Sequence, residues 1–178
     1  MSNSKKVYKG AIITTCKKYR YLLTRGYSGN PKDPFVLFIG LNPSIADSEI
    51  DDPTLRRCLG FMEKWDLQAL KIVNLFAYRA TDPNAMLIQS EPIGMQNDRI
   101  IEAEAKNANF IILCWGNAGS HLNRDKAVIS LLEKYSHKTF TFGLTKLGQP
   151  KHPLYLSKST RLERFLPKIE IPKMELEL

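Results

Sequence analysis

The sequence has no apolar run approaching the roughly 20 residues that a membrane-spanning helix needs. Its first ten residues, MSNSKKVYKG, are polar and basic. They contain no apolar segment of the kind found in secretory signal peptides. These two absences predict a protein without a membrane partner that resides in the cytoplasm.

Cysteine is scarce, with three residues scattered at Cys16, Cys58 and Cys114. Zinc and iron–sulfur sites use cysteines at short, regular spacings, which this chain does not have. An odd number of isolated thiols is typical of a reducing compartment, which again indicates the cytoplasm. The chain also lacks a Ser/His/Asp signature, a Walker phosphate loop and a GxGxxG motif.

What remains is the composition of a globular protein with 178 residues, 43% of them hydrophobic and 25% charged. This length predicts a single α/β domain over residues 1–178, with residues 1–6 and 168–178 as flexible arms. The net charge of +8 favours an anionic partner such as nucleic acid or a nucleotide. The number of subunits is left open.

Apolar runs and helical patterns alternate along the chain after an expected hairpin at residues 7–24. We predict strands at 35–39, 71–76, 109–115 and 139–142, and helices at 53–65, 83–89, 94–107 and 120–135. Two helices are expected to begin at Asp-Pro pairs, Asp52-Pro53 and Asp82-Pro83, because aspartate caps a helix and proline suits its first position. This order predicts a three-layer α/β/α sandwich with a mainly parallel central sheet.

The loops that follow the four strands are expected to meet at one edge of the sheet, where open α/β folds bind ligands. The chemically informative residues of these loops are Asn42, Asn74, Phe76, Tyr78, Trp115 and His152. An amide reads the edge of a base, an aromatic ring stacks on its face, and an imidazole stabilises a departing anion. The pattern therefore predicts a pocket for a planar heterocycle.

Most of the chain, from Tyr19 to Leu156, resembles a bacterial and phage family of unknown function. The matching blocks are GLNPSIADSEIDDPTLRRC, VNLFAYRATDP, Gly94 with Asn97-Asp98, CWGNAG, and GLTKLGQPKHPLYL. Because the function of that family is unknown, this resemblance predicts no activity.

Three shorter blocks are similar, in order, to motifs of the uracil-DNA glycosylase superfamily: GLNPS at 40–44, ILCWG at 112–116, and HPL at 152–154. The superfamily fold is an α/β/α sandwich with a parallel sheet, in agreement with the fold expected above. The chain departs from the superfamily after the His-Pro pair, where LYL stands in place of a small residue followed by proline.

The second resemblance implies an enzyme that cleaves the N-glycosidic bond of a base, including modified bases, in DNA or in a nucleotide, without a cofactor. Asn42 would orient the attacking water and His152 would hydrogen-bond the leaving base. The base would be bound by Asn74, Phe76, Tyr78 and Trp115. The phosphates would be contacted by Arg79, Lys146 and Lys151. Leu154 or Tyr155 would fill the gap left by a flipped base.

Two other interpretations remain open. The acidic loop containing Asp47, Glu49, Asp51 and Asp52 offers the oxygen ligands that Mg²⁺ or Mn²⁺ prefers, which would suit a metal-dependent enzyme acting on phosphodiesters or nucleotides. Alternatively, the protein is a non-catalytic module that binds nucleic acid or a nucleotide, and Asn42 and His152 are then dispensable.

Overall fold

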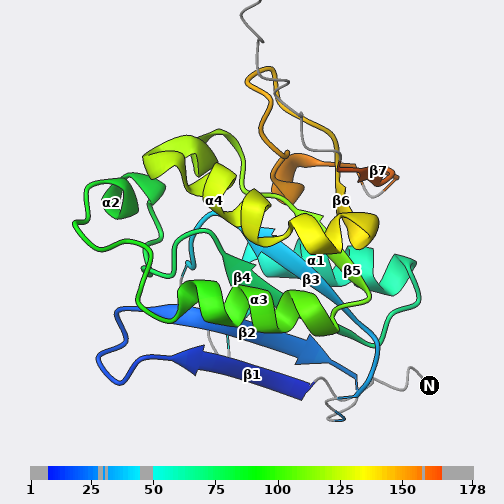
Figure 1. Ribbon diagram of the computed structural model, residues 1–178. Coiled ribbons are helices and arrows are strands. Elements are labelled where there is room, and N and C mark those ends of the chain that lie inside the picture. The colour runs from blue at the N-terminus through cyan, green and yellow to red at the C-terminus, as the bar shows by residue number, and fades with distance from the viewer. Residues whose placement is uncertain (1–7, 28–29, 31, 45–49, 158, 166–178) are drawn as a thin grey trace, which may run out of the picture.

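The computed structural model describes residues 8–27, 30, 32–44, 50–157 and 159–165, and these residues form a seven-stranded sheet with helices on both faces (Figure 1). The strands are β1 (Tyr8–Ile13), β2 (Arg20–Gly26), β3 (Phe35–Gly40), β4 (Ala69–Asn74), β5 (Phe110–Leu113), β6 (Thr139–Thr141) and β7 (Glu163–Arg164). The α-helices are α1 (Pro53–Lys64), α2 (Pro83–Leu87), α3 (Asn97–Asn107) and α4 (Arg124–Leu131). Short 3₁₀ helices are η1 (Asn117–Asn123), η2 (Glu133–Lys138) and η3 (Pro153–Tyr155).

The spatial order of the strands is β1-β2-β4-β3-β5-β6-β7. The central four strands, β4, β3, β5 and β6, are parallel, whereas β1, β2 and β7 pair in antiparallel fashion. The α/β class is therefore confirmed, but the sheet is mixed, and a parallel arrangement holds for its centre alone. The β1–β2 hairpin adds antiparallel strands at one edge, and the segment 142–162 returns the chain so that β7 pairs antiparallel with β6 at the other edge.

Both Asp-Pro helix starts are confirmed. The carboxylate of Asp52 accepts a hydrogen bond from the Leu55 N–H, and that of Asp82 accepts one from the Asn84 N–H. A continuous helix over 120–135 is wrong, because Leu122 and Asn123 adopt left-handed φ angles of 54° and 53°. That break ends η1 and lets α4 begin at Arg124. The proposed arms, 1–6 and 168–178, lie outside the described residues.

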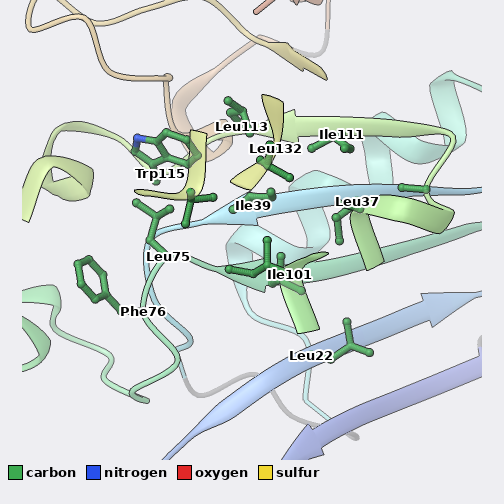
Figure 2. Packing of buried hydrophobic residues seen from close by; sticks show 14 of the residues in the cluster. Leu22, Leu37, Ile39, Leu75, Phe76, Ile101, Ile111, Leu113, Trp115 and Leu132 are labelled. Atoms are coloured by element: carbon green, nitrogen blue, oxygen red, sulfur yellow. The ribbon is translucent and has the colours of Figure 1, made fainter. Parts of the chain in front are cut away.

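Two hydrophobic cores lie on opposite faces of the sheet because side chains alternate along each strand. On one face, α3 and α4 pack against inward residues of β3 and β5, such as Leu37, Ile39 and Leu113 (Figure 2). On the other face, α1 covers Val36 and Phe38 together with the alternate residues of β2, β4 and β5. None of the helices among the described residues has the length and hydrophobicity of a membrane-spanning helix.

The arrangement of the central strands creates a topological switch point. The chain passes from β3 to β4 on one side of β3, and the next strand, β5, pairs with the opposite side. Connections that leave a sheet in opposite directions open a crevice at the carboxyl ends of the strands, and ligands bind there in open α/β sheets. This crevice lies at the ends of β3 and β5, where Gly40 and Leu113 stand.

Candidate functional site

A pocket of about 470 Å³ occupies this edge of the sheet, on the face that α1 covers. Its size is within the range of small-molecule sites. The walls come from the ends of β3, β4 and β5, from the start of α1, and from the segment around η3. Several residues expected at the site line it: Asn42, Asp52, Asn74, Trp115 and His152, together with Leu154 and Tyr155.

Asn74, the last residue of β4, presents a buried amide to this pocket. It lies on the same face of β4 as Leu70 and Ile72, which pack under α1, because side chains alternate along the strand. The residue is 4% exposed, and its Nδ2 has no hydrogen-bond partner among the described residues. An unsatisfied buried donor is costly, so this N–H group is available to an acceptor on a ligand or a water molecule.

Gly40 makes room for the Asn74 amide. The two residues are neighbours in the parallel ladder between β3 and β4. A Cβ atom at position 40 would lie 2.8 Å from the Asn74 Oδ1, which is closer than real Cβ contacts come. The glycine of the GLNPS block is therefore needed for the position of the asparagine side chain.

The backbone behind Asn74 is held by buried polar groups from α3 and α4. The fully buried Asn97 donates from Nδ2 to the carbonyl oxygens of Asn74 and Leu75, at 2.9 Å each. Arg124 donates from Nε to the Leu75 carbonyl at 2.8 Å and forms an ion pair with Asp98. The Asn97-Asp98 block of the sequence thus fixes the end of the strand that carries Asn74.

Asn42 is half-buried and oriented by contacts on one side of its amide. Its Nδ2 donates to the carbonyl of Ala80 at 2.8 Å and to that of Pro43 at 3.2 Å. No partner of Oδ1 is recorded in the described part of the chain. The carbonyl end of this side chain is therefore the end available to a ligand or a water molecule.

His152 reaches the pocket from the residue preceding η3. Its Nδ1 accepts a hydrogen bond from the Leu154 N–H at 3.3 Å. Burial lowers the pKa of His152, and the charge of Asp52 partly opposes this effect. A neutral imidazole with Nδ1 as acceptor carries its proton on Nε2, so His152 offers a donor at neutral pH.

We expect the stability of the protein to fall as the pH drops below about 6.5, the ordinary histidine value, because of His152. Its folded-state pKa is lowered by burial, so the unfolded chain binds a proton first as the pH falls. The contribution of His152 to stability is fully present above its unfolded-state pKa. It is lost as the pH falls through its folded-state pKa. Urea unfolding at pH 7.5 and 5.0 checks this. His152→Gln should lose less stability than the wild type over that interval, and an equal loss would contradict the prediction.

Trp115 forms a wall of the pocket and is held by a chain of side-chain hydrogen bonds. Its Nε1 donates to Gln149 Oε1 at 2.7 Å, and Gln149 Nε2 donates to the buried Asp125 at 2.6 Å. Gly119 lies against the indole ring, where a Cβ would come within 2.1 Å of a ring carbon. These contacts fix the indole rigidly at the end of β5.

Two thiols also line the pocket, those of Cys58 and Cys114. Burial raises the pKa of Cys58 well above its usual range and that of Cys114 to about 12. Both thiols are therefore protonated at neutral pH, and neither is an activated nucleophile.

Two aromatic residues expected at the site lie elsewhere. Phe76 is fully buried, with its ring centroid 5.7 Å from that of His121. Tyr78 packs edge-on against Tyr19, and the amino group of Lys18 lies 5.7 Å from its ring. Neither residue lines the pocket described above.

The three basic residues expected to contact phosphates also stand outside the pocket lining. Arg79 donates from its guanidinium to the Lys17 carbonyl at 3.3 Å. Lys146 and Lys151 are exposed in the segment between β6 and η3, where Leu144 and Pro150 form an antiparallel bridge.

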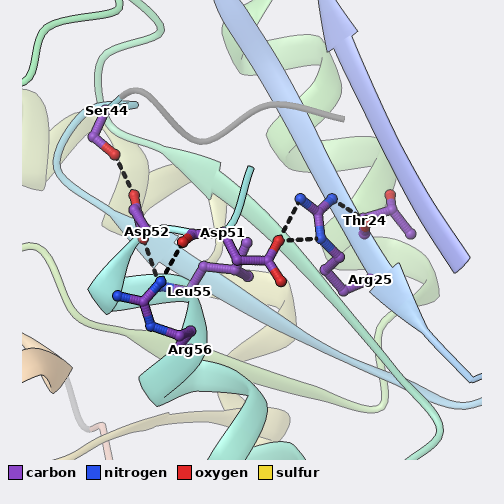
Figure 3. Close-up of polar contacts among 7 residues, drawn as sticks. All are labelled: Thr24, Arg25, Ser44, Asp51, Asp52, Leu55 and Arg56. Atoms are coloured by element: carbon purple, nitrogen blue, oxygen red, sulfur yellow. Dashed lines mark hydrogen bonds and ion pairs between the residues drawn. The ribbon is translucent and has the colours of Figure 1, made fainter. Parts of the chain in front are cut away.

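Two carboxylates of the acidic loop, those of Asp51 and Asp52, form contacts with neighbouring side chains and with the backbone (Figure 3). Asp51 forms an ion pair with the fully buried Arg25, with 2.8 Å between Oδ1 and the guanidinium. Asp52 accepts from Leu55 N–H and from the Ser44 hydroxyl. Asp47 and Glu49 lie outside the described residues. Within the described ranges, no group of three or more His, Cys, Asp or Glu side chains is placed to hold a metal ion.

Sequence reasoning missed one charged group of the pocket wall. Arg20, at the start of β2, is buried and lines the pocket. Asp52, which was expected both as a helix cap and as a candidate acid of the site, lines the pocket as well. The signal that could have identified Arg20 is the presence of an arginine within the otherwise apolar and aromatic run from Tyr19 to Leu23.

Comparison with known proteins places the chain in a family but assigns no chemistry to the site. No curated protein and no solved structure matches this chain. The resemblance to a family of unknown function is confirmed: the model of the family described as "Protein of unknown function (DUF1643)" matches residues 20–154, and the chain belongs to this family.

Proposed function

We propose that this protein is a nucleobase-recognising enzyme that hydrolyses the N-glycosidic bond of a base in DNA or in a nucleotide. The observation that carries the proposal is the buried Asn74 Nδ2, which lines the pocket without a partner in the described structure. A carbonyl oxygen on the edge of a base would supply the missing acceptor. Phe38 and Trp115 provide apolar walls for a flat ring.

The contacts of Asn42 and His152 suit the roles that the proposed reaction requires of them. Cleavage leaves an oxocarbenium-like sugar and a base that gains negative charge. The Asn42 Oδ1 would orient the attacking water, since the other end of this amide is held by Ala80. The Nε2–H of His152 would donate to the base oxygen as it gains charge, a type of contact worth about 3 kcal/mol in other enzymes.

The proposal includes a uracil-DNA-glycosylase-like sandwich and a polynucleotide substrate. It is supported by the positions of the GLNPS, CWG and HPL blocks, all of which contribute to one pocket at the carboxyl edge of parallel strands. The net charge of +8 and the exposed Lys146 and Lys151 suit contacts with phosphates.

The test is a base-release assay with oligonucleotides that carry modified bases and with the corresponding nucleosides. We expect release of free base that persists in EDTA and is lost in Asn42→Ala. Strand or phosphate-ester cleavage that EDTA abolishes would favour a metal-dependent enzyme instead. Salt-dependent binding without release of any base would identify a binding module, and either result would overturn the proposal.

Gly40→Ala is expected to weaken binding of the free base about tenfold. The new methyl group would displace the Asn74 amide and cost one hydrogen bond, about 1.4 kcal/mol. Calorimetric titration with the released base measures this effect. Gly60→Ala is the matched control, because a Cβ at position 60 of α1 has nothing within 4 Å. Equal affinity of the two variants would argue against a base-binding role for Asn74.

A further inference from the structure

Hydrolysis of a glycosidic bond requires a group that takes a proton from water. Asn42 and His152 are unsuited to this task. The Asn42 amide orients water but is not a base. The His152 imidazole already holds its proton on Nε2, and its Nδ1 is occupied by the Leu154 N–H. The pocket therefore needs a further proton acceptor.

Asp52 is the acidic side chain that the described residues contribute to the pocket lining. Its carboxylate is fixed at both oxygens, since Oδ1 accepts from Leu55 N–H at 2.7 Å and Oδ2 accepts from the Ser44 hydroxyl (Figure 3). Each carboxylate oxygen has two acceptor sites, so both retain capacity for a water molecule.

The ion-pair partners of Asp52 differ from those of its neighbour Asp51. Arg25 neutralises Asp51, whereas no ion pair to Asp52 is recorded in the described part of the chain. The charge of Asp52 also acts on His152 across the pocket, where it opposes the effect of burial. The Asp52 carboxylate is therefore a group held in place by hydrogen bonds, without a salt bridge among the described residues, and it lines the same pocket as the imidazole.

We propose that Asp52 is a catalytic residue, the general base that accepts a proton from the attacking water. This role rests on the function proposed above. The water oxygen forms a bond to C1′ of the sugar while the C1′–N bond breaks, and the bonding electron pair leaves with the base. One water proton passes to the Asp52 carboxylate and returns through solvent to the departing base anion. The carboxylate also stabilises the positive charge that develops on the sugar.

The test compares Asp52→Asn with Asp82→Asn. Both aspartates precede a proline and cap a helix, but Asp82 lies outside the pocket lining. The amide retains an oxygen for the helix cap, so both variants should fold. We expect kcat for base release to fall about 100-fold or more in Asp52→Asn, with binding of the free base unchanged. Asp82→Asn should retain the wild-type rate.

A second readout does not depend on turnover. Titration of the His152 ring by NMR should give a lower pKa in Asp52→Asn than in the wild type, because the opposing charge is gone. An unchanged value, or equal rates of base release in Asp52→Asn and the wild type, would overturn the role of Asp52 alone. Failure of the wild type to release any base would instead overturn the proposed function and this role with it.

Discussion

Replacing Asp51 by alanine is expected to destabilise the folded protein by about 3 kcal/mol. Arg25 is fully buried, and Asp51 accepts from its guanidinium at 2.8 and 2.9 Å. Removing the carboxylate keeps the arginine charge in the interior without this counter-ion, and the cost of burying charge is then no longer offset. The loss is large against the roughly 5–15 kcal/mol that holds a domain together. Urea unfolding followed by circular dichroism measures it.

Glu102→Ala is the control for this prediction, since it removes an ion pair with Lys134 in which both side chains are exposed. Exposed pairs contribute about 1 kcal/mol or less. A loss in Asp51→Ala no greater than that in Glu102→Ala would show that the Arg25 contact contributes little. Mg²⁺ or Mn²⁺ that stabilised the wild type but not Asp51→Ala would favour a metal site in the loop.

The Asp51 contact also bears on the pocket. Asp51 directly precedes Asp52, and the Arg56 side chain donates to the Asp51 carbonyl. The backbone is therefore held from β2 and from α1 at the residue before the proposed general base. An ion pair outside the pocket thus positions a carboxylate inside it, and Asp51→Ala should slow base release as well as lower stability.

Much of the fold followed from local patterns in the sequence. The apolar run from Phe35 to Ile39 and the pairs Asp52-Pro53 and Asp82-Pro83 identify a buried strand and two helix starts correctly. The break at Leu122 and Asn123 could not be seen, because neither residue requires a left-handed conformation. The β1–β2 hairpin was expected, but its antiparallel pairing with β4 and the antiparallel strand β7 were missed, because these pairings join segments that are distant in the sequence.

The site was less predictable than the fold. The alternation that puts Ile72 and Asn74 on one face of β4 was visible in the sequence, but the face that carries the pocket depends on how the chain crosses the sheet. Phe76 and Tyr78 follow the end of β4, and loop residues have no such alternation to place them. Arg20 enters the pocket from an antiparallel strand that the loop argument did not consider.

His152→Ala is expected to lower kcat for base release about 100- to 1,000-fold while the protein stays folded. The Nε2–H would no longer be present to stabilise the base oxygen as it gains negative charge. The variant loses the cap on η3, a change of about 1 kcal/mol, which the domain should tolerate. Single-turnover release at saturating protein isolates the chemical step from binding.

The matched control is His137→Ala, which removes an exposed imidazole that lies outside the pocket lining. His152→Gln adds a sharper comparison, since its side-chain amide can donate a hydrogen bond but cannot become charged. Partial recovery of kcat in this variant would indicate that His152 acts as a neutral donor, in agreement with its lowered pKa. Full activity of His152→Ala would exclude the imidazole from the chemistry and leave Asn74 and Asp52 to account for any base release.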